Sequence, residues 1–467
     1  MNKKILFLVD HKHRDLPGLS LISYFLNHYG CQSKIVALGS YDEIIRTFDP
    51  EYIVLPKPNH DLEKMMSWRL AGRKIIIIDA EGNPQDKNFI YKIRVKPDLY
   101  IFWNNEIKHR YSQLSKQYNT VLKTLGFYRS DFLHPDLHDL IPSREVILKK
   151  YNLDALSKTI TIATSTQDAH FSKKRLHDKN KRRAKSLEGT AKYFDIVNNR
   201  LELKEKTEYM INIIVRNFPD INLIIKPHPN ENVVYWDNLI KKIDSQNVKL
   251  FIGEPINNLL KVSDFHIAHN VCTTTSEALL YGVPAIEMHC DDSKDLFSEE
   301  HLYIANFIIN NSKDIIPIIN LLIRGNEDPE AQDYKNKSTF SDYVDSYLYK
   351  YDGLRCFEYA KYLLAYMDKP KPKKIRIYNL FTNSVNILLY LVVKIRNKIH
   401  PRFRKQKKID KEVNNVLIKN NRETIKINNK LVDKEYGLFD NRIKEGDEEY
   451  WYDKFKENKH IQDLLKR

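Results

Sequence analysis

The sequence predicts an α/β fold class made of two successive parallel-sheet units, and two observations lead to this prediction. Short apolar segments alternate with helix-like segments over about the first 130 residues, and the alternation restarts near Thr159. Short strands that alternate with helices are typical of a parallel sheet covered on both faces. The chain has 467 residues, 42% of them hydrophobic, which is enough for at least two cores.

The first unit is expected to span residues 1–140, with a helix from about Gly18 to Tyr29 after the first strand. Its predicted strands have the sequences ILFLV, SKIVAL, YIVLP, KIIIID, LYIFW and TVLKTLG. Each is short and mostly apolar, as expected of a buried strand.

The second unit is expected to span residues 150–345, with helices near Lys204–Asn217 and over Thr275–Tyr281. Its predicted strands are TITIATS, NLIIKPHP, VKLFIG, DFHIAHN and PAIEMH. After the first of these strands, residues 171–189 are highly basic and nearly free of apolar side chains. This stretch is either a solvated loop or a loop that orders over an anionic substrate.

Positive charge is concentrated toward the C-terminus. Lys and Arg outnumber Asp and Glu by 76 to 61, and the net charge of +15 indicates an anionic partner. Residues 369–408 hold thirteen Lys and Arg but no Asp or Glu, around the apolar run Val385–Val393. This composition favours a segment that lies in a membrane interface beside anionic lipids, although a helix packed on the folded body is the alternative. Nucleic acid is disfavoured as a partner, because the charge does not interleave with aromatic residues.

The other C-terminal segments are less informative. Residues 346–368 are expected to form a helix that could cross back to the first unit. Residues 409–467 are polar and charged with weak helical periodicity, which indicates a partly ordered tail.

Cysteine usage and hydropathy favour the cytoplasm. The four cysteines are scattered without a paired spacing, which indicates neither a disulfide framework nor a zinc ribbon. The apolar run near the N-terminus is broken by Asp10 and is too short for a signal peptide. No run approaches the roughly 18 apolar residues of a spanning helix. We expect a cytoplasmic protein bound peripherally at the inner face of the cytoplasmic membrane.

A histidine between two prolines follows a predicted core strand of the second unit. In the segment INLIIKPHPNEN, Pro227 and Pro229 restrict the backbone around His228. Ligands of open parallel sheets bind beyond the carboxyl ends of the strands, which is where this histidine falls. His228 is therefore a candidate ligand-binding residue.

A second motif, HNVCTTTSEALLYGVPAIE, begins at His269. Here a strand leads through a turn rich in hydroxyl side chains into a helix, whose first N–H groups favour an anion. The alternative is ordinary N-capping by Thr274, Thr275 or Ser276.

The order of these two motifs resembles the nucleotide-binding half of GT-B glycosyltransferases. It is more narrowly similar to bacterial sialyl-, polysialyl- and Kdo-transferases, which use CMP-activated sugars. The resemblance covers about residues 1–345 and implies two Rossmann-like domains that face a cleft, the first for the acceptor and the second for the nucleotide sugar. It also implies that His228 contacts the cytidylate phosphate and stabilises its departure.

The same resemblance implies a set of donor-binding residues in the second domain. Phosphate-binding hydroxyls fall at the helix start, and the ATSTQ loop lies where related enzymes contact the donor. The implied set is Ser165, Thr166, Gln167, Lys226, Pro229, Asn230, Thr273, Thr274, Thr275, Ser276 and Glu277.

These transferases also carry two adjacent acidic residues followed by glycine in the first domain. In IIIIDAEGNP the pattern falls on Asp79 and Glu81, with Ala80 at one acidic position. An acceptor hydroxyl that attacks an anomeric carbon needs a carboxylate to take its proton, so the base is Glu81 or Asp79, with Glu81 preferred. An ordinary turn or N-cap aspartate is the alternative.

The loop in VDHKHRDLPGLSLI resembles the start of bacterial surface carbohydrate biosynthesis proteins. Its arginine and histidines are expected to bind an anionic sugar. A metal site is conceivable for His-x-His with two aspartates, but GT-B transferases are generally metal-independent and the sequence places no third ligand. The expected acceptor- or sugar-binding residues are His11, His13, Arg14, Asp15 and Gly18.

We therefore expect a glycosyltransferase without metal or cofactor that uses a CMP-activated nonulosonic-type sugar as co-substrate. The acceptor would be a glycan or lipid-linked glycan of a bacterial surface, of capsule or lipopolysaccharide type. Alternative enzymes are a CDP-glycerol-type polyol-phosphate transferase and a GT-B transferase or epimerase with another nucleotide sugar. The non-enzymatic alternative is a basic nucleic-acid-binding protein.

Overall fold

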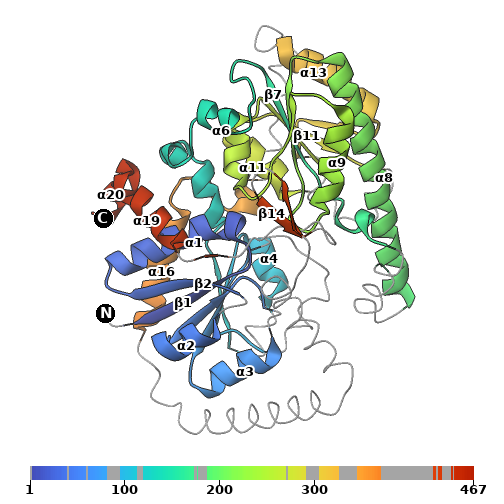
Figure 1. Ribbon diagram of the computed structural model, residues 1–467. Helices are drawn as coiled ribbons and strands as arrows, with labels where there is room; N and C mark the ends of the chain where they lie inside the picture. The colour runs from blue at the N-terminus through green and yellow to red at the C-terminus, as the bar shows by residue number, and fades with distance from the viewer. Residues whose placement is uncertain are drawn as a thin grey trace. The chain divides into compact units, whose positions relative to one another are not determined.

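The computed structural model divides the chain into two units, and each has its own parallel sheet (Figure 1). The first unit comprises the described parts of Met1–Leu140, Val344–Asn421 and Arg442–Arg467, and the second those of Ile141–Tyr343 and Arg422–Asn441. The described residues are 3–38, 41–58, 61–80, 95–112, 119–172, 176, 187–269, 272–290, 304–324, 344–369, 424–427, 430–433, 443–444 and 446–466.

The first unit contains a six-stranded parallel sheet in the order β2-β1-β3-β4-β5-β6. Alternate residues of each strand face opposite sides: Phe7 packs toward α1 and α16, while Leu6 and Leu8 pack toward α2 and α3. Both faces are covered, which explains the uninterrupted apolar strands. The elements are β1 (Lys4–Val9), α1 (Lys12–His28), β2 (Gln32–Ala37), α2 (Asp42–Phe48), β3 (Tyr52–Leu55), α3 (Leu62–Leu70), β4 (Lys74–Ile78), β5 (Leu99–Phe102), α4 (Asn105–Arg110), β6 (Val121–Thr124), the 3₁₀ helices η2 (Tyr128–Leu133) and η3 (Pro135–Leu140), the π-helical turn η8 (Val344–Leu348) and α16 (Arg355–Asp368).

Helix α1 starts at Lys12, six residues before the predicted start at Gly18. Pro17 lies inside the helix, where its ring nitrogen cannot donate to the carbonyl of His13. The helix nevertheless continues because its apolar face is buried against the sheet. Consequently the charged residues of the predicted binding loop lie on the first turns of a helix.

Two C-terminal helices, α19 (Asp447–Glu457) and α20 (Lys459–Leu465), belong to the core of the first unit. Their residues Phe455, Ile461 and Leu464 are at most 2% exposed. The Tyr452 hydroxyl lies 2.7 Å from Ser23 Oγ on α1. The sequence indicated only a partly ordered tail over 409–467, so this packing was not predicted. Because α19 and α20 complete a hydrophobic core, we expect their removal to destabilise the first unit.

The second unit contains a six-stranded parallel sheet in the order β12-β11-β10-β7-β8-β9. The strand order reverses between β7 and β10, and the carboxyl edge at such a reversal is where open α/β sheets bind ligands. The elements are α6 (Arg144–Lys150), β7 (Thr159–Ala163), η4 (Gln167–His170), α8 (Leu187–Asn217), β8 (Asn222–Lys226), α9 (Val233–Ile243), β9 (Val248–Leu250), α10 (Ile256–Val262), β10 (Phe265–His269), α11 (Thr273–Tyr281), β11 (Ala285–Met288), β12 (Phe307–Ile309), η6 (Ser312–Asp314) and α13 (Ile315–Arg324). A short antiparallel pair, β13 (Thr424–Ile427) and β14 (Lys430–Asp433), is also assigned to this unit.

The predicted α/β class with two parallel sheets is confirmed. Helix α8 begins at Leu187, earlier than predicted. The last residues of the basic stretch 171–189 are therefore helical. Residues 173–175 and 177–186 of this stretch lie outside the described residues. The basic segment 369–408 also lies outside them, apart from Lys369. Across the described ranges, no helix is both long enough and apolar enough to cross a membrane.

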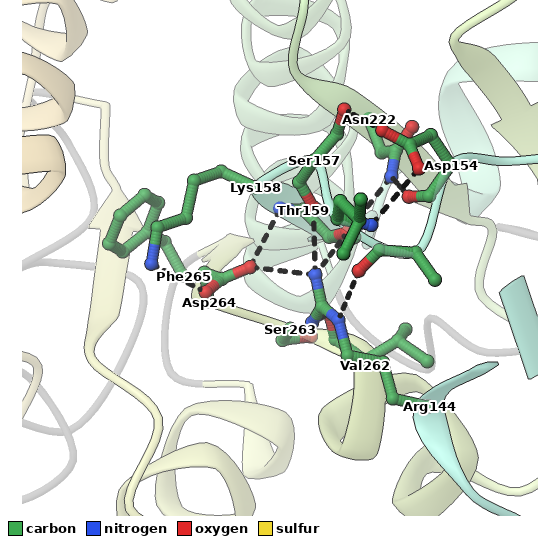
Figure 2. Close-up of polar contacts among 12 residues, drawn as sticks. Arg144, Asp154, Ser157, Lys158, Thr159, Asn222, Val262, Ser263, Asp264 and Phe265 are labelled. Atoms are coloured by element: carbon green, nitrogen blue, oxygen red, sulfur yellow. Dashed lines mark hydrogen bonds and ion pairs between the residues drawn. The ribbon is translucent and has the colours of Figure 1, made fainter.

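A partly buried arginine lies at the amino edge of the second sheet (Figure 2). Arg144 lies 3.0 Å from the Asp264 carboxylate and donates to the Ser157 carbonyl at 2.9 Å and to Thr159 Oγ1 at 3.1 Å. Lys158 adds a second ion pair to Asp264 at 3.0 Å. These contacts join the starts of β7 and β10, and we assign them a structural role because open α/β sheets bind ligands at the opposite, carboxyl edge.

Candidate functional site

His228 lies just beyond β8, at the carboxyl edge of the second sheet. Its Nδ1 accepts a hydrogen bond of 3.1 Å from the backbone N–H of Asn230, and its carbonyl accepts one of 2.8 Å from the N–H of Glu231. A neutral imidazole with an accepting Nδ1 carries its proton on Nε2. The turn therefore fixes the ring orientation and makes Nε2 a hydrogen-bond donor.

Lys226, the last residue of β8, lies near the start of α11. Burial lowers the pKa of its ammonium group, while the negative charge of Glu277 and of other nearby groups raises it. A phosphate bound beside this lysine would further stabilise the charged form. Lys226 is thus placed to contribute positive charge at the same edge as His228.

The start of α11 offers backbone N–H groups for an anion, because Cys272 at the N-cap gives it no side-chain cap. Two of the predicted hydroxyls have partners within the protein. Thr275 Oγ1 donates to Glu287 at 2.7 Å, and Thr274 Oγ1 lies 3.1 Å from His266 Nε2. Thr274 and Thr275 therefore hold the helix in place, and Ser276 and Glu277 are buried beside them in the first turns.

The loop after β7 is held by a buried glutamate that the sequence analysis missed. Glu231 is fully buried and accepts hydrogen bonds from the Thr164 hydroxyl, from the Thr166 N–H and, at 2.8 Å, from Trp236 Nε1. Three donors to one carboxylate compensate for its burial, which by itself raises its pKa. Glu231 follows the KPHPN motif directly, but only the fold reveals its partners.

His269, at the end of β10, holds the same loop from the other side. Its Nδ1 accepts from the Ser165 N–H at 3.0 Å, and its Nε2 lies 2.7 Å from Thr207 Oγ1. The Thr207 hydroxyl donates to the Leu203 carbonyl, so it accepts from Nε2–H. Burial lowers the pKa of His269 to about 3, and the ring stays neutral. Of the other predicted loop residues, Gln167 donates to Ser165 Oγ at 3.3 Å.

We expect the second unit to lose stability as the pH falls from about 6.5 toward 4. Burial lowers the pKa of His170 to about 4 and of His266 and His269 to about 3. The unfolded chain therefore binds more protons than the folded chain in this range. Each histidine lowers the free energy of unfolding by up to about 1.4 kcal/mol for each pH unit of acidification. Glu231 has the opposite effect, because burial raises its pKa and the folded chain then binds up to one proton more than the unfolded chain at this residue.

Hydrogen–deuterium exchange of β7, β8 and β10 between pH 4.5 and 7 would measure this loss. The His269→Gln variant should reduce the slope of the unfolding free energy against pH by the contribution of one proton, about 1.4 kcal/mol per pH unit. An unchanged slope in that variant would contradict the assignment of a neutral, buried His269.

The carboxyl edge of the first sheet gathers most of the predicted sugar-binding residues. Asp15 on α1 is fully buried, and Arg14 binds its two oxygens at 2.7 and 2.9 Å. Arg129, which the sequence analysis missed, lies 3.8 Å from the same carboxylate. The three side chains carry a net charge of +1 and form what we call the arginine pair at Asp15.

The other predicted residues of this loop have different surroundings. Gly18 is buried in α1, and a Cβ there would lie 2.6 Å from a ring carbon of Tyr128, so the structure gives it a packing role. The rings of His11 and His13 meet edge to face, with centroids 6.4 Å apart. Asp10, beside them, pairs with Lys57 at 2.9 Å. In the part of the chain that the structure describes, no group of His, Cys, Asp and Glu is arranged to hold a metal ion.

Asp79 follows β4 at the same edge. Its N–H donates to the Ile101 carbonyl at 3.1 Å, and its carbonyl accepts from Trp103 Nε1 at 2.7 Å. The backbone of this residue is therefore fixed on both sides. Glu81, the preferred base, lies outside the described residues.

Neither a protein-family model nor a curated protein sequence matches the chain. Among solved structures, a variant of the wall teichoic acid polymerase TagF soaked with CDPG has a TM-score of 0.52 and 12% identity, over 78% of this chain and 88% of that chain. A second structure of the variant gives a TM-score of 0.50 with the same identity and coverage. S. aureus MnaA with UDP gives 0.49 and 12% identity, over 79% of this chain and 99% of that chain. At this identity the TagF similarity concerns the fold alone, and the chain has the GT-B-like fold with two Rossmann-like units that the sequence predicted.

Proposed function

We propose that this chain is a GT-B glycosyltransferase that moves a nonulosonic-type acid sugar from a CMP donor to a bacterial surface glycan. The observation that carries the proposal is the fixed orientation of His228, whose Nδ1 accepts from Asn230 at 3.1 Å and leaves Nε2–H as a donor at the carboxyl edge. Lys226 and the uncapped start of α11 add positive potential at that edge. Such an edge suits the departing cytidylate.

The proposed reaction forms one bond and breaks one bond at the anomeric carbon. The acceptor oxygen attacks, the bond to the phosphate oxygen breaks, and CMP leaves with the bonding electrons. His228 donates a hydrogen bond to the phosphate as its charge grows. Glu81, or Asp79 in its place, takes the proton of the acceptor hydroxyl. No step uses a metal ion or a cofactor.

A CDP-glycerol-type polyol-phosphate transferase is the second candidate. TagF, which shares the fold, was studied with CDPG. Both candidate reactions release CMP, so the same phosphate-binding edge serves either one. They differ in the group transferred, which is an acid sugar in the first case and a polyol phosphate in the second.

Thermal stabilisation by nucleotides tests the proposal. A ligand that binds only the folded state raises the free energy of unfolding by about 2.7 kcal/mol when its concentration is about a hundred times its Kd. We expect CMP to raise the Tm, and UDP or an oligonucleotide to raise it little. Turnover of CMP-N-acetylneuraminic acid or of CDP-glycerol then separates the two candidates. Stabilisation by UDP without stabilisation by CMP would overturn both.

We further propose that residues 369–408 bind an anionic membrane surface and hold the protein at the inner face of the cytoplasmic membrane. Each Lys or Arg near such a surface contributes roughly 1 kcal/mol to the free energy of binding, and salt weakens this contribution. The apolar run adds a contribution that salt does not weaken. We expect the full-length chain to sediment with phosphatidylglycerol vesicles and poorly with phosphatidylcholine vesicles.

Replacing Leu388, Leu389 and Leu391 with Ser should weaken the vesicle binding that persists at high salt. Leu156→Ser is the matched control, because Leu156 is a leucine of the second unit with 95% exposure. The full chain is required, since α19 and α20 are part of the core of the first unit. Equal binding to both kinds of vesicle would contradict the proposal.

A further inference from the structure

Arg129 is a buried arginine whose hydrogen-bonding groups are poorly used. It lies in η2, just after β6, and only 8% of its side chain is exposed. Its closest polar contacts are long: 3.4 Å from Nη2 to the Ala80 carbonyl and 3.8 Å from Nη1 to the Asp15 carboxylate. Its Nε has no hydrogen-bond partner. The guanidinium instead lies over the rings of Phe127, at 4.8 Å, and Trp103, at 5.4 Å.

Arg355, another buried arginine of the same unit, shows what a structural role looks like. It is 5% exposed, contacts both oxygens of Asp352 at 2.9 and 2.7 Å, and donates to the Leu125 carbonyl at 3.1 Å. A guanidinium has five N–H donors, and a buried charge is stable only when it is paired and hydrogen-bonded. The contacts of Arg129 fall well short of this standard.

Asp15 does not neutralise Arg129, because both of its oxygens are engaged by Arg14 at 2.7 and 2.9 Å. The arginine pair at Asp15 therefore keeps one uncompensated positive charge at the carboxyl edge of the first sheet. The underused Nε–Nη2 side of Arg129 is the side that binds carboxylate or phosphate oxygens in a bidentate manner. Ala80, which this side approaches, is the neighbour of Asp79.

We infer that Arg129, supported by Arg14, binds an oxyanion of the acceptor: a sugar carboxylate or a phosphate ester. That this oxyanion belongs to the acceptor rests on the proposed function, whereas the oxyanion site itself rests on the contacts of Arg129. The acceptor is then an acidic glycan, and its charged group is held near Asp79, one of the two candidate bases. The rings of Trp103 and Phe127 lie against the guanidinium and restrict its orientation.

Isothermal titration of the full chain, without nucleotide, tests this inference. The probes are N-acetylneuraminic acid for a carboxylate, glycerol 3-phosphate for a phosphate, and galactose as a neutral sugar. We expect at least one acid to bind and galactose not to bind, and the stronger acid identifies the oxyanion. Arg129→Met should weaken the acid about ten- to a hundredfold, and Arg129→Lys less, because lysine keeps the charge but not the bidentate geometry.

The matched control is Arg73→Met, since Arg73 is a partly buried arginine of the same unit whose partner at 2.7 Å, Asp49, is exposed. It should bind the acid as the unchanged protein does. Unchanged affinity in folded Arg129→Lys and Arg129→Met, or binding of galactose equal to that of the acids, would overturn the inference. If CMP stabilises the protein but neither acid binds, the inference fails and the proposed function stands. If the acids bind through Arg129 but CMP has no effect, the oxyanion site stands and the proposed function fails.

Discussion

Replacing His228 with alanine is expected to lower kcat about a hundred- to a thousandfold while the protein remains folded. The histidine is only partly buried, and its Nδ1 accepts from the N–H of the exposed residue Asn230, which water can solvate after the change. The loss therefore falls on the hydrogen bond to the departing phosphate. Steady-state turnover of CMP-N-acetylneuraminic acid, or of CDP-glycerol if that is the donor, measures the effect.

His228→Gln should recover part of the activity, because the amide keeps an N–H donor near the position of Nε2. His138→Ala in the first unit is the matched control, since His138 Nε2 donates to the Leu133 carbonyl at 2.7 Å, within the first unit. Near-normal turnover in His228→Ala would remove the histidine from the mechanism.

The sequence predicted the fold class because a parallel sheet with two covered faces needs apolar side chains at nearly every strand position. It also predicted a ligand site, because the motif residues follow directly after strands that end at one edge, and this site stays a prediction. His228 is the clearest case, since two neighbouring prolines restrict its backbone in any fold.

The partners of these residues could not be predicted, because they lie far away in the sequence. Glu231 holds the loop at Thr166, 65 residues earlier, and Tyr452 meets Ser23 across 429 residues. Arg129 lies in an apolar and aromatic stretch that carries no recognisable motif. Only the packed structure shows that it shares Asp15 with Arg14.

In the proposed mechanism a carboxylate of the first unit takes the acceptor proton, and we expect Glu81→Gln to lower kcat about a hundred- to ten-thousandfold. CMP affinity should change little, because the proposed base acts on the acceptor and the proposed phosphate site belongs to the second unit. Asp79→Asn is expected to have the smaller effect. Burial, and then the charge of Asp79, raises the pKa of Tyr100 and Tyr111, so the Asp79 carboxylate lies near packed aromatic side chains.

Single-turnover rates with saturating donor separate the two assignments, because they report the transfer step without product release. Asp98→Asn is not a suitable control, since Asp98 pairs with Arg69 and Lys74 and its loss would disturb the fold. Asp42→Asn is suitable, because Asp42 is exposed on α2. An inactive Asp79→Asn beside an active Glu81→Gln would assign the role of the base to Asp79, and the proposed phosphate site in the second unit would still stand. If both single variants kept full activity, neither carboxylate would be the base, and the proton would have to pass to another group at this edge.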